Sequence, residues 1–287
     1  MGTLKEGFFS RFCVISFLML FLCSSFLLVG CGTNIFEGFV DQEESLGNLL
    51  DDASSVEDYR DILEKTSSII ESSSSSDAEK SDAFFVQAEA LLGVNEVSSL
   101  DLFGELSTAA DAASSNPLSV LDIDTSNVDL IKASESIASA NSLGGTGSPD
   151  QNLLKGVVNT MVVVNTVQET FDVQEDGTLV QKNNESYWDS LDSLMNPAGS
   201  SSDQTLKDFS DDAFSGFNNS GSMTSEQLEE VKSVNTAITE SSALYKAVKE
   251  GGVYNGKTYA GIVGDAAPTS AEVAMIEDQL SSIFKDF

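Results

Sequence analysis

The stretch from residue 150 to 171 constrains the fold of this chain more than any other. From Leu153 to Val167 only Lys155 carries a charge, and a helix that is apolar on almost every side must be buried. The run from Met161 to Val164 would also suit a β-strand, because valine favours strands. The length of the stretch and the capping signals ahead of it favour the helix. We therefore expect 150–171 to be a central helix around which the rest of the chain packs.

Signals for helix starts and turns recur on both sides of this stretch. Ser or Thr followed three residues later by Glu or Gln is the capping-box signature, and it occurs at Ser76–Glu79, Ser148–Gln151, Thr224–Gln227 and Thr269–Glu272. Apolar residues at helical spacing predict further helices over 42–52, 56–70, 77–92, 99–113, 127–143, 187–195, 203–217, 224–250 and 269–287. Asn255-Gly256 predicts a tight β-hairpin, and Asp176-Gly177 suggests a second. The expected fold is mainly α: an irregular helical bundle or a degenerate helical-repeat array around the central apolar helix (150–171), with one or two short β-hairpins.

The N-terminal segment has the pattern of a secretory leader. An apolar stretch from Phe12 to Val29 follows Lys5 and Arg11, and it ends at Leu28-Val29-Gly30-Cys31. This quartet resembles the lipobox of bacterial lipoproteins. The resemblance implies cleavage before Cys31, a diacylglyceryl group on the Cys31 thiol, and three acyl chains on the modified cysteine in all. Because Gly32 rather than Asp follows, the resemblance also implies the outer membrane.

The leader divides the chain into expected parts. Residues 1–30 are a signal peptide, 31–40 a lipidated tether, and 41–287 a single helical domain that could divide near 172–200. A transmembrane anchor over the same apolar stretch is an alternative, since 18 residues can just cross a hydrocarbon core. A plain signal peptide with a coincidental cysteine is another.

The charge of the chain limits its partners. Removing residues 1–30 takes away two of the 14 basic and one of the 46 acidic residues, which leaves 12 and 45 and a net charge of −33. Such a surface repels nucleic acid and attracts cations, basic proteins or basic peptides. Solubility alone, or a salty habitat, would also explain the charge, which is spread along the whole chain.

Several kinds of chemistry are excluded by missing residue types. The chain has no histidine, and two of its three cysteines, Cys13 and Cys23, lie in the leader. Ser-His-Asp and Cys-His catalysis and His-ligated metals therefore have no basis in this sequence. Paired carboxylates could in principle hydrolyse glycosides, but nothing singles out two of 45 acids. We expect no enzyme, no cofactor and no metal site.

Two acidic segments have oxygen-bearing side chains at spacings similar to those of cation sites. The loop at 172–183 resembles a calcium-binding EF-hand loop at Asp172, Asp176, Gly177 and Leu179. Gln174 is a poor third ligand, and Asn183 replaces the bidentate Glu, so an Asp-Gly turn is the favoured interpretation. In the second segment, Asp122, Asp124 and Ser126 alternate ahead of a predicted helix, and capping of that helix is favoured over ligation.

Three other features are better explained by structure than by binding. The glycine-rich loop 144–148 lacks the Lys-Ser/Thr of a phosphate loop and is predicted to be a linker. The aromatic pairs Tyr187-Trp188 and Tyr254/Tyr259 are predicted to belong to the core rather than to line a ligand surface. Ala88 to Gly93 resembles the second helix of tetratricopeptide-type repeats over about one hairpin. That family's Trp, Tyr and Pro positions are not matched and no regular repeat follows, so a regular solenoid is not expected.

Two functional hypotheses follow. The first is a membrane-anchored, non-catalytic helical lipoprotein that binds or scaffolds another component of the bacterial cell envelope. Its partners would be the lipid bilayer, through acylated Cys31, and an envelope protein or basic ligand. The alternative is a periplasmic or surface protein that binds a cation or a cationic ligand through its carboxylates.

Overall fold

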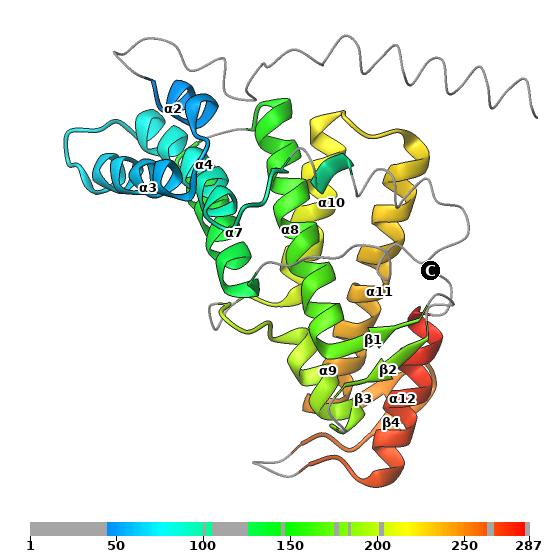
Figure 1. Ribbon diagram of the computed structural model, residues 1–287. Coiled ribbons are helices and arrows are strands. Elements are labelled where there is room, and N and C mark those ends of the chain that lie inside the picture. The colour runs from blue at the N-terminus through cyan, green and yellow to red at the C-terminus, as the bar shows by residue number, and fades with distance from the viewer. Residues whose placement is uncertain are drawn as a thin grey trace, which may run out of the picture.

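The protein is mainly helical, as predicted, with its strands confined to two short hairpins (Figure 1). The computed structural model describes residues 45–99, 102–104, 126–144, 147–174, 178–182, 185–200, 204–262 and 267–284. Within them the helices are α2 (Leu46–Asp52), α3 (Val56–Glu71), α4 (Asp77–Val94), α7 (Asn127–Ser142), α8 (Pro149–Thr170), α9 (Tyr187–Met195), α10 (Leu206–Ser220), α11 (Ser225–Glu250) and α12 (Ser270–Phe284). The strands are β1 (Phe171–Val173), β2 (Leu179–Gln181), β3 (Gly252–Tyr254) and β4 (Lys257–Tyr259).

The helices form an irregular array in which α8 packs mainly on α10, two helices further along the chain, and α9 packs on α11 and α12. The order of contact is α3, α4, α7, α8, α10 and α11, and α9 and α12 pack against α11. Figure 1 shows α2, α3 and α4 at one end of the array, with α12 and the β3–β4 hairpin at the other. The array is therefore elongated from the N-terminal helices to the C-terminal ones.

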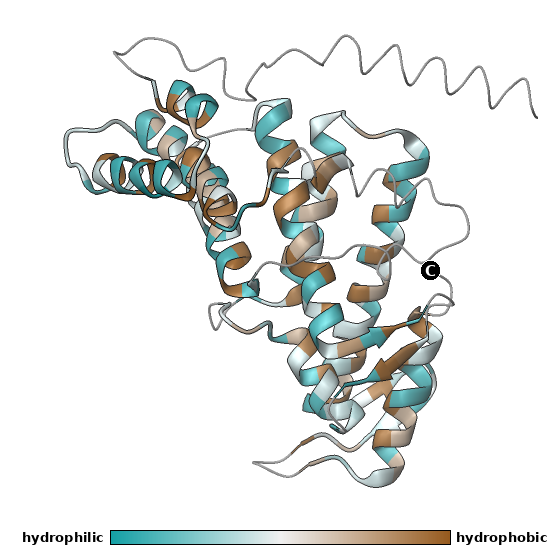
Figure 2. Ribbon diagram, viewed as in Figure 1, coloured by the Kyte–Doolittle hydropathy of each residue, from teal (hydrophilic) through white to brown (hydrophobic). Residues whose placement is uncertain are grey.

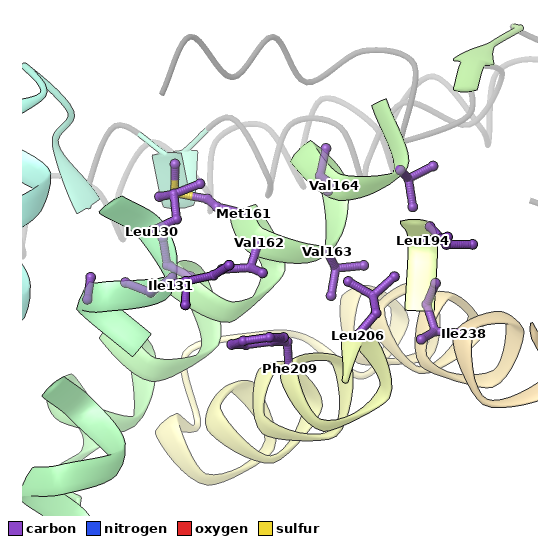
Figure 3. Close-up of a cluster of buried hydrophobic side chains, with 14 of the residues drawn as sticks. Leu130, Ile131, Met161, Val162, Val163, Val164, Leu194, Leu206, Phe209 and Ile238 are labelled. Atoms are coloured by element: carbon purple, nitrogen blue, oxygen red, sulfur yellow. The ribbon is translucent and has the colours of Figure 1, made fainter. Parts of the chain in front are cut away.

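The predicted central helix is confirmed as α8, which lies between α7 and α10 (Figure 1). Its residues from Val157 to Val167 are buried apart from Thr160, so the helical interpretation of the valine run is correct. Figure 2 shows hydrophobic residues along α8 and α10 and on the strands of the β1–β2 hairpin. The buried side chains gather in one cluster, of which Figure 3 labels Leu130, Ile131, Met161, Val162, Val163, Val164, Leu194, Leu206, Phe209 and Ile238.

The backbones of α8 and α10 approach each other closely where the two helices cross. A β-carbon placed on Gly216 would lie 2.4 Å from the backbone nitrogen of Gly156, and one on Gly156 would lie 2.7 Å from the Phe217 ring. Two glycines thus let the helix backbones nearly touch. The Lys155 ammonium adds an ion pair across this interface, 2.6 Å from an Asp212 carboxylate oxygen.

Capping boxes start many of the helices. The signatures at Ser76–Glu79, Ser148–Gln151 and Thr224–Gln227 are confirmed by reciprocal bonds between side chains and backbone. Thr269 and Glu272 make the same reciprocal bonds ahead of α12. Further boxes occur at Ser55–Asp58, Ser186–Asp189 and Thr205–Asp208. Each of these boxes satisfies backbone N–H groups that the first helical turn leaves unpaired.

Both predicted hairpins are present. β1 pairs with β2 in the register Phe171↔Gln181, and β3 pairs with β4 in the register Gly252↔Tyr259. Asn255 and Gly256 have φ angles of 44° and 74°, the left-handed conformation that a two-residue turn of this type requires.

A few predicted boundaries need correction. The first described helix begins at Leu46 rather than at residue 42, because Ser45 caps it. The helix predicted over 203–217 begins at Leu206 behind the Thr205 cap and continues to Ser220, where Gly221 ends it with a φ of 67°. Of the helix predicted over 99–113, Ser99 and residues 102–104 are helical, and the remainder lies outside the described residues.

Candidate functional site

The predicted lipidation residue, Cys31, lies outside the described part of the chain, which begins at residue 45. Asp122 and Asp124 lie outside it as well. The helix predicted after them does begin at Asn127, but Ser126 makes no capping bond with its side chain. Ser126 thus occupies the predicted N-cap position of α7, where its backbone carbonyl, rather than its side chain, accepts hydrogen bonds from Asp129 and Leu130.

The geometry of the 172–183 loop is that of a β-hairpin. Asp172 lies opposite Val180 in the β1–β2 register, and its carboxylate is 3.6 Å from the Lys182 ammonium. In an EF-hand loop the first carboxylate instead turns inward to share an ion with the twelfth residue. The turn itself, residues 175–177, is not among the described residues. Across the ranges that are described, no group of three or more acidic, cysteine or histidine side chains could hold a metal ion.

The glycine-rich loop connects α7 to α8. Gly144 and Gly147 both have positive φ angles, 90° and 25°, and Ser148 directly after them caps α8. The Asn152 side chain donates a hydrogen bond to the Gly147 carbonyl at 2.8 Å. The described residues of this loop therefore turn the chain and start α8.

The predicted aromatic pairs lie in or against the core, as expected. Tyr259 is 2% exposed and belongs to the core, and Tyr254 packs against it from β3. Burial, together with the nearby Glu240 carboxylate, raises the pKa of Tyr254 to about 12. Tyr187 is partly buried, and burial followed by the charge of Glu277 on α12 raises its pKa.

Tyr245, the stacking partner of Trp188, lies at the centre of a group of polar and aromatic side chains between α9 and α11. The Trp188 ring stacks on Tyr245 of α11, with centroids 5.4 Å apart and planes 6° from parallel. The Tyr245 hydroxyl donates to an Asp192 carboxylate oxygen at 2.6 Å. The same hydroxyl accepts from the Asn196 amide at 3.1 Å and from the Lys249 ammonium at 2.7 Å. We call these five residues the α9–α11 cluster.

The polar groups around the Tyr245 hydroxyl are hydrogen-bonded to one another within the α9–α11 cluster. Its members stand one turn apart, at 188, 192 and 196 on or just after α9 and at 245 and 249 on α11, so each helix presents one face to the other. The hydrogen bond to Tyr245 raises the pKa of the Lys249 ammonium, which keeps its positive charge. The donor and acceptor capacity of the Tyr245 hydroxyl is used within the cluster. The cluster therefore joins α9 to α11. Sequence reasoning missed Asp192, Asn196, Tyr245 and Lys249, although the four-residue spacing was visible.

A second polar feature is a buried acid on α4. The Ser99 hydroxyl donates a hydrogen bond of 2.6 Å to Oε1 of Glu89, while Oε2 is buried and has no hydrogen-bond partner. Burial raises the pKa of Glu89. On the same helix, burial raises the pKa of Asp82 to about 6. Folding therefore makes both carboxyl groups harder to ionise than they are in the unfolded chain.

This burial predicts that Glu89→Gln stabilises the domain at neutral pH. Unfolded glutamate loses its proton near pH 4.3, whereas folded Glu89 keeps its proton to higher pH, so wild-type stability falls as pH rises between these values. Glutamine keeps the acceptor for Ser99 without the charge. We expect the two proteins to melt alike near pH 4, and the variant to gain near pH 7 by about 1.4 kcal/mol for each unit by which folding raises the pKa of Glu89.

Glu79→Gln is the matched control on the same helix. Hydrogen bonds from the Ser76 backbone and side chain lower the pKa of Glu79, so its charge stabilises the folded state above the unfolded pKa and that contribution is lost in acid. Any loss of stability in this variant, relative to the wild type, should therefore appear at neutral pH and vanish at low pH. Thermal melts across pH 4–8 measure both, and a Glu89→Gln advantage that does not grow with pH would contradict the assignment.

Comparisons with protein-family models, with curated proteins and with solved structures find no match to this chain. Among the helices that are described, none is both long enough and apolar enough to cross a membrane.

Proposed function

We propose that this chain is a lipid-anchored, non-catalytic helical protein of the bacterial cell envelope, which binds or scaffolds another envelope component. The observation that carries the proposal is the sequence Leu28-Val29-Gly30-Cys31 at the end of the apolar stretch from Phe12 to Val29. Gly32 after the cysteine favours the outer membrane as the destination. A chain with three acyl groups on one residue would remain anchored, because two hydrophobic signals already suffice for stable attachment.

The non-catalytic part of the proposal is supported by residue types and by the packing of the helices. The whole chain lacks histidine, and its one cysteine outside the apolar stretch is the proposed lipid carrier. The α9–α11 cluster uses its hydrogen bonds to join two helices. An extended array of packed helices presents broad outer faces, which suit contacts with another macromolecule.

Metabolic labelling tests the anchor. In bacteria fed a radioactive fatty acid, the wild type should be labelled and should sediment with membranes. Cys31→Ser should lose the label completely, because no other thiol follows the leader. Cys23→Ser, a cysteine within the apolar stretch, is the matched control and should be labelled like the wild type. Equal labelling of Cys31→Ser, or release of the wild type as a soluble protein, would refute the proposal.

A further inference from the structure

Both ends of the chain after the leader carry a net negative charge, but the charge per residue differs between them. Residues 32–99 contain 16 acidic and three basic residues, whereas residues 204–287 contain 13 acidic and six basic ones. The net charge is therefore −13 over the first 68 residues and −7 over the last 84. The charge density near the proposed lipid is more than twice that at the far end.

The structure places residues 45–99, the described portion of this acidic part, at one end of the array. α2, α3 and α4 occupy that end, and α12 with the β3–β4 hairpin occupies the other (Figure 1). On α3 the side chains of Asp61, Glu64 and Glu71 are exposed to solvent. The Arg60 guanidinium, one of three basic groups in this part, lies 3.8 Å from the Glu57 carboxylate. These helices therefore present a predominantly negative surface.

The distance between the proposed lipid and this surface is limited by chain length. Thirteen residues, of which four are acidic, separate Cys31 from Ser45 at the start of the described chain. Fully extended, they span at most about 50 Å at roughly 3.5 Å per residue. An anchored domain could thus lie against the headgroups or stand away from them.

We propose that the dense negative charge of α2–α4 holds the tethered end of the anchored domain away from a bilayer that contains anionic lipids. This inference rests on the proposed lipid anchor. Anionic leaflets attract basic segments within about a Debye length of the surface, and the same field repels acidic ones. At physiological ionic strength the Debye length is about 8 Å, so the repulsion acts within that distance and the tether sets the upper limit. Salt should therefore bring the acidic helices toward the membrane.

Energy transfer from the full lipidated protein to a dye on the vesicle headgroups tests this arrangement. The donor is placed on Ser73→Cys, exposed between α3 and α4, or on Val253→Cys, 68% exposed at the opposite end. On vesicles with phosphatidylglycerol, transfer from position 73 should be roughly two-fold lower at about 0.01 M salt, where the Debye length is about 30 Å, than at about 1 M, where it is about 3 Å. On pure phosphatidylcholine it should not change with salt. On the anionic vesicles, transfer from position 253, at the less acidic end, should change less with salt than transfer from position 73.

Charge variants separate the role of α3 from that of the total charge. Neutralising Asp61, Glu64 and Glu71 with Asn, Gln and Gln should raise transfer from position 73 on anionic vesicles at low salt. Neutralising Glu226, Glu230 and Glu240, which are exposed on α11, removes the same charge and should change it much less. Equal effects of the two triple variants, or transfer that is insensitive to salt, would overturn the proposed standoff. A wild type that does not associate with either vesicle would instead refute the anchor, and the standoff with it.

Discussion

Val162→Asp should leave the domain largely unfolded at neutral pH. Val162 is fully buried in α8, within the apolar cluster drawn in Figure 3. An aspartate there can avoid ionisation at pH 7 only if its pKa rises by about 3 units from its ordinary value near 3.9, and holding its proton at neutral pH then costs about 4 kcal/mol. The burial of the valine side chain, worth about 1.5–3 kcal/mol, is lost as well. Together these approach the entire stability of a typical domain, roughly 5–15 kcal/mol.

The measurement is circular dichroism, with thermal melts where a folded signal remains. Val253→Asp is the matched control, because this valine is 68% exposed on β3 and the same substitution should change stability by no more than about 0.5 kcal/mol. Lowering the pH toward 4 should partly restore Val162→Asp, because the neutral acid costs less to bury. A Val162→Asp protein that melts like the control would show that α8 is not the centre of the core.

Features that depend on a few neighbouring residues were predictable from the sequence. The helix at α8, with its Ser148–Gln151 capping box, follows from local bonding and an apolar surface on nearly every side. The Asn255-Gly256 turn follows from backbone conformations that those two residues tolerate well. The capping boxes at Ser55, Ser186 and Thr205 were missed because their third helical residue is Asp. Its shorter side chain still reaches the cap, so a search for Glu or Gln alone is too narrow.

Contacts between distant helices could not be predicted in the same way. The joining of α9 to α11 depends on Tyr245 meeting Asp192, 53 residues away, and nothing local to either residue specifies that meeting. The buried state of Glu89 likewise depends on the neighbours of α4, since its own helical position would suit an exposed face equally well. The lipid anchor is the opposite case. The residues around Cys31 predict it without any long-range contact. It stays a prediction because Cys31 lies outside the described structure.

The Gly216→Ala variant should also be strongly destabilised, for steric rather than electrostatic reasons. The added methyl carbon would lie 2.4 Å from the Gly156 nitrogen and 2.7 Å from the Asn152 carbonyl oxygen. Both are backbone atoms of α8, so no side-chain rotation relieves the clash and the helices must separate. Overpacking of this kind costs about 1–3 kcal/mol or more, against a gain of only about 0.5–1 kcal/mol from the better helix propensity of alanine.

Two other glycines turn this prediction into a graded test by thermal melting. A β-carbon on Gly93 would lie 2.4 Å from the Tyr59 ring, which is a side chain that can move, so Gly93→Ala should cost less than Gly216→Ala. A β-carbon on Gly104 would meet nothing within 4 Å, so Gly104→Ala should be neutral or slightly stabilising. The expected order of melting temperature is therefore Gly104→Ala, then Gly93→Ala, then Gly216→Ala. If Gly216→Ala melted as high as Gly104→Ala, α8 and α10 could not cross as closely as their backbones indicate, and the centre of the array would have to be packed differently.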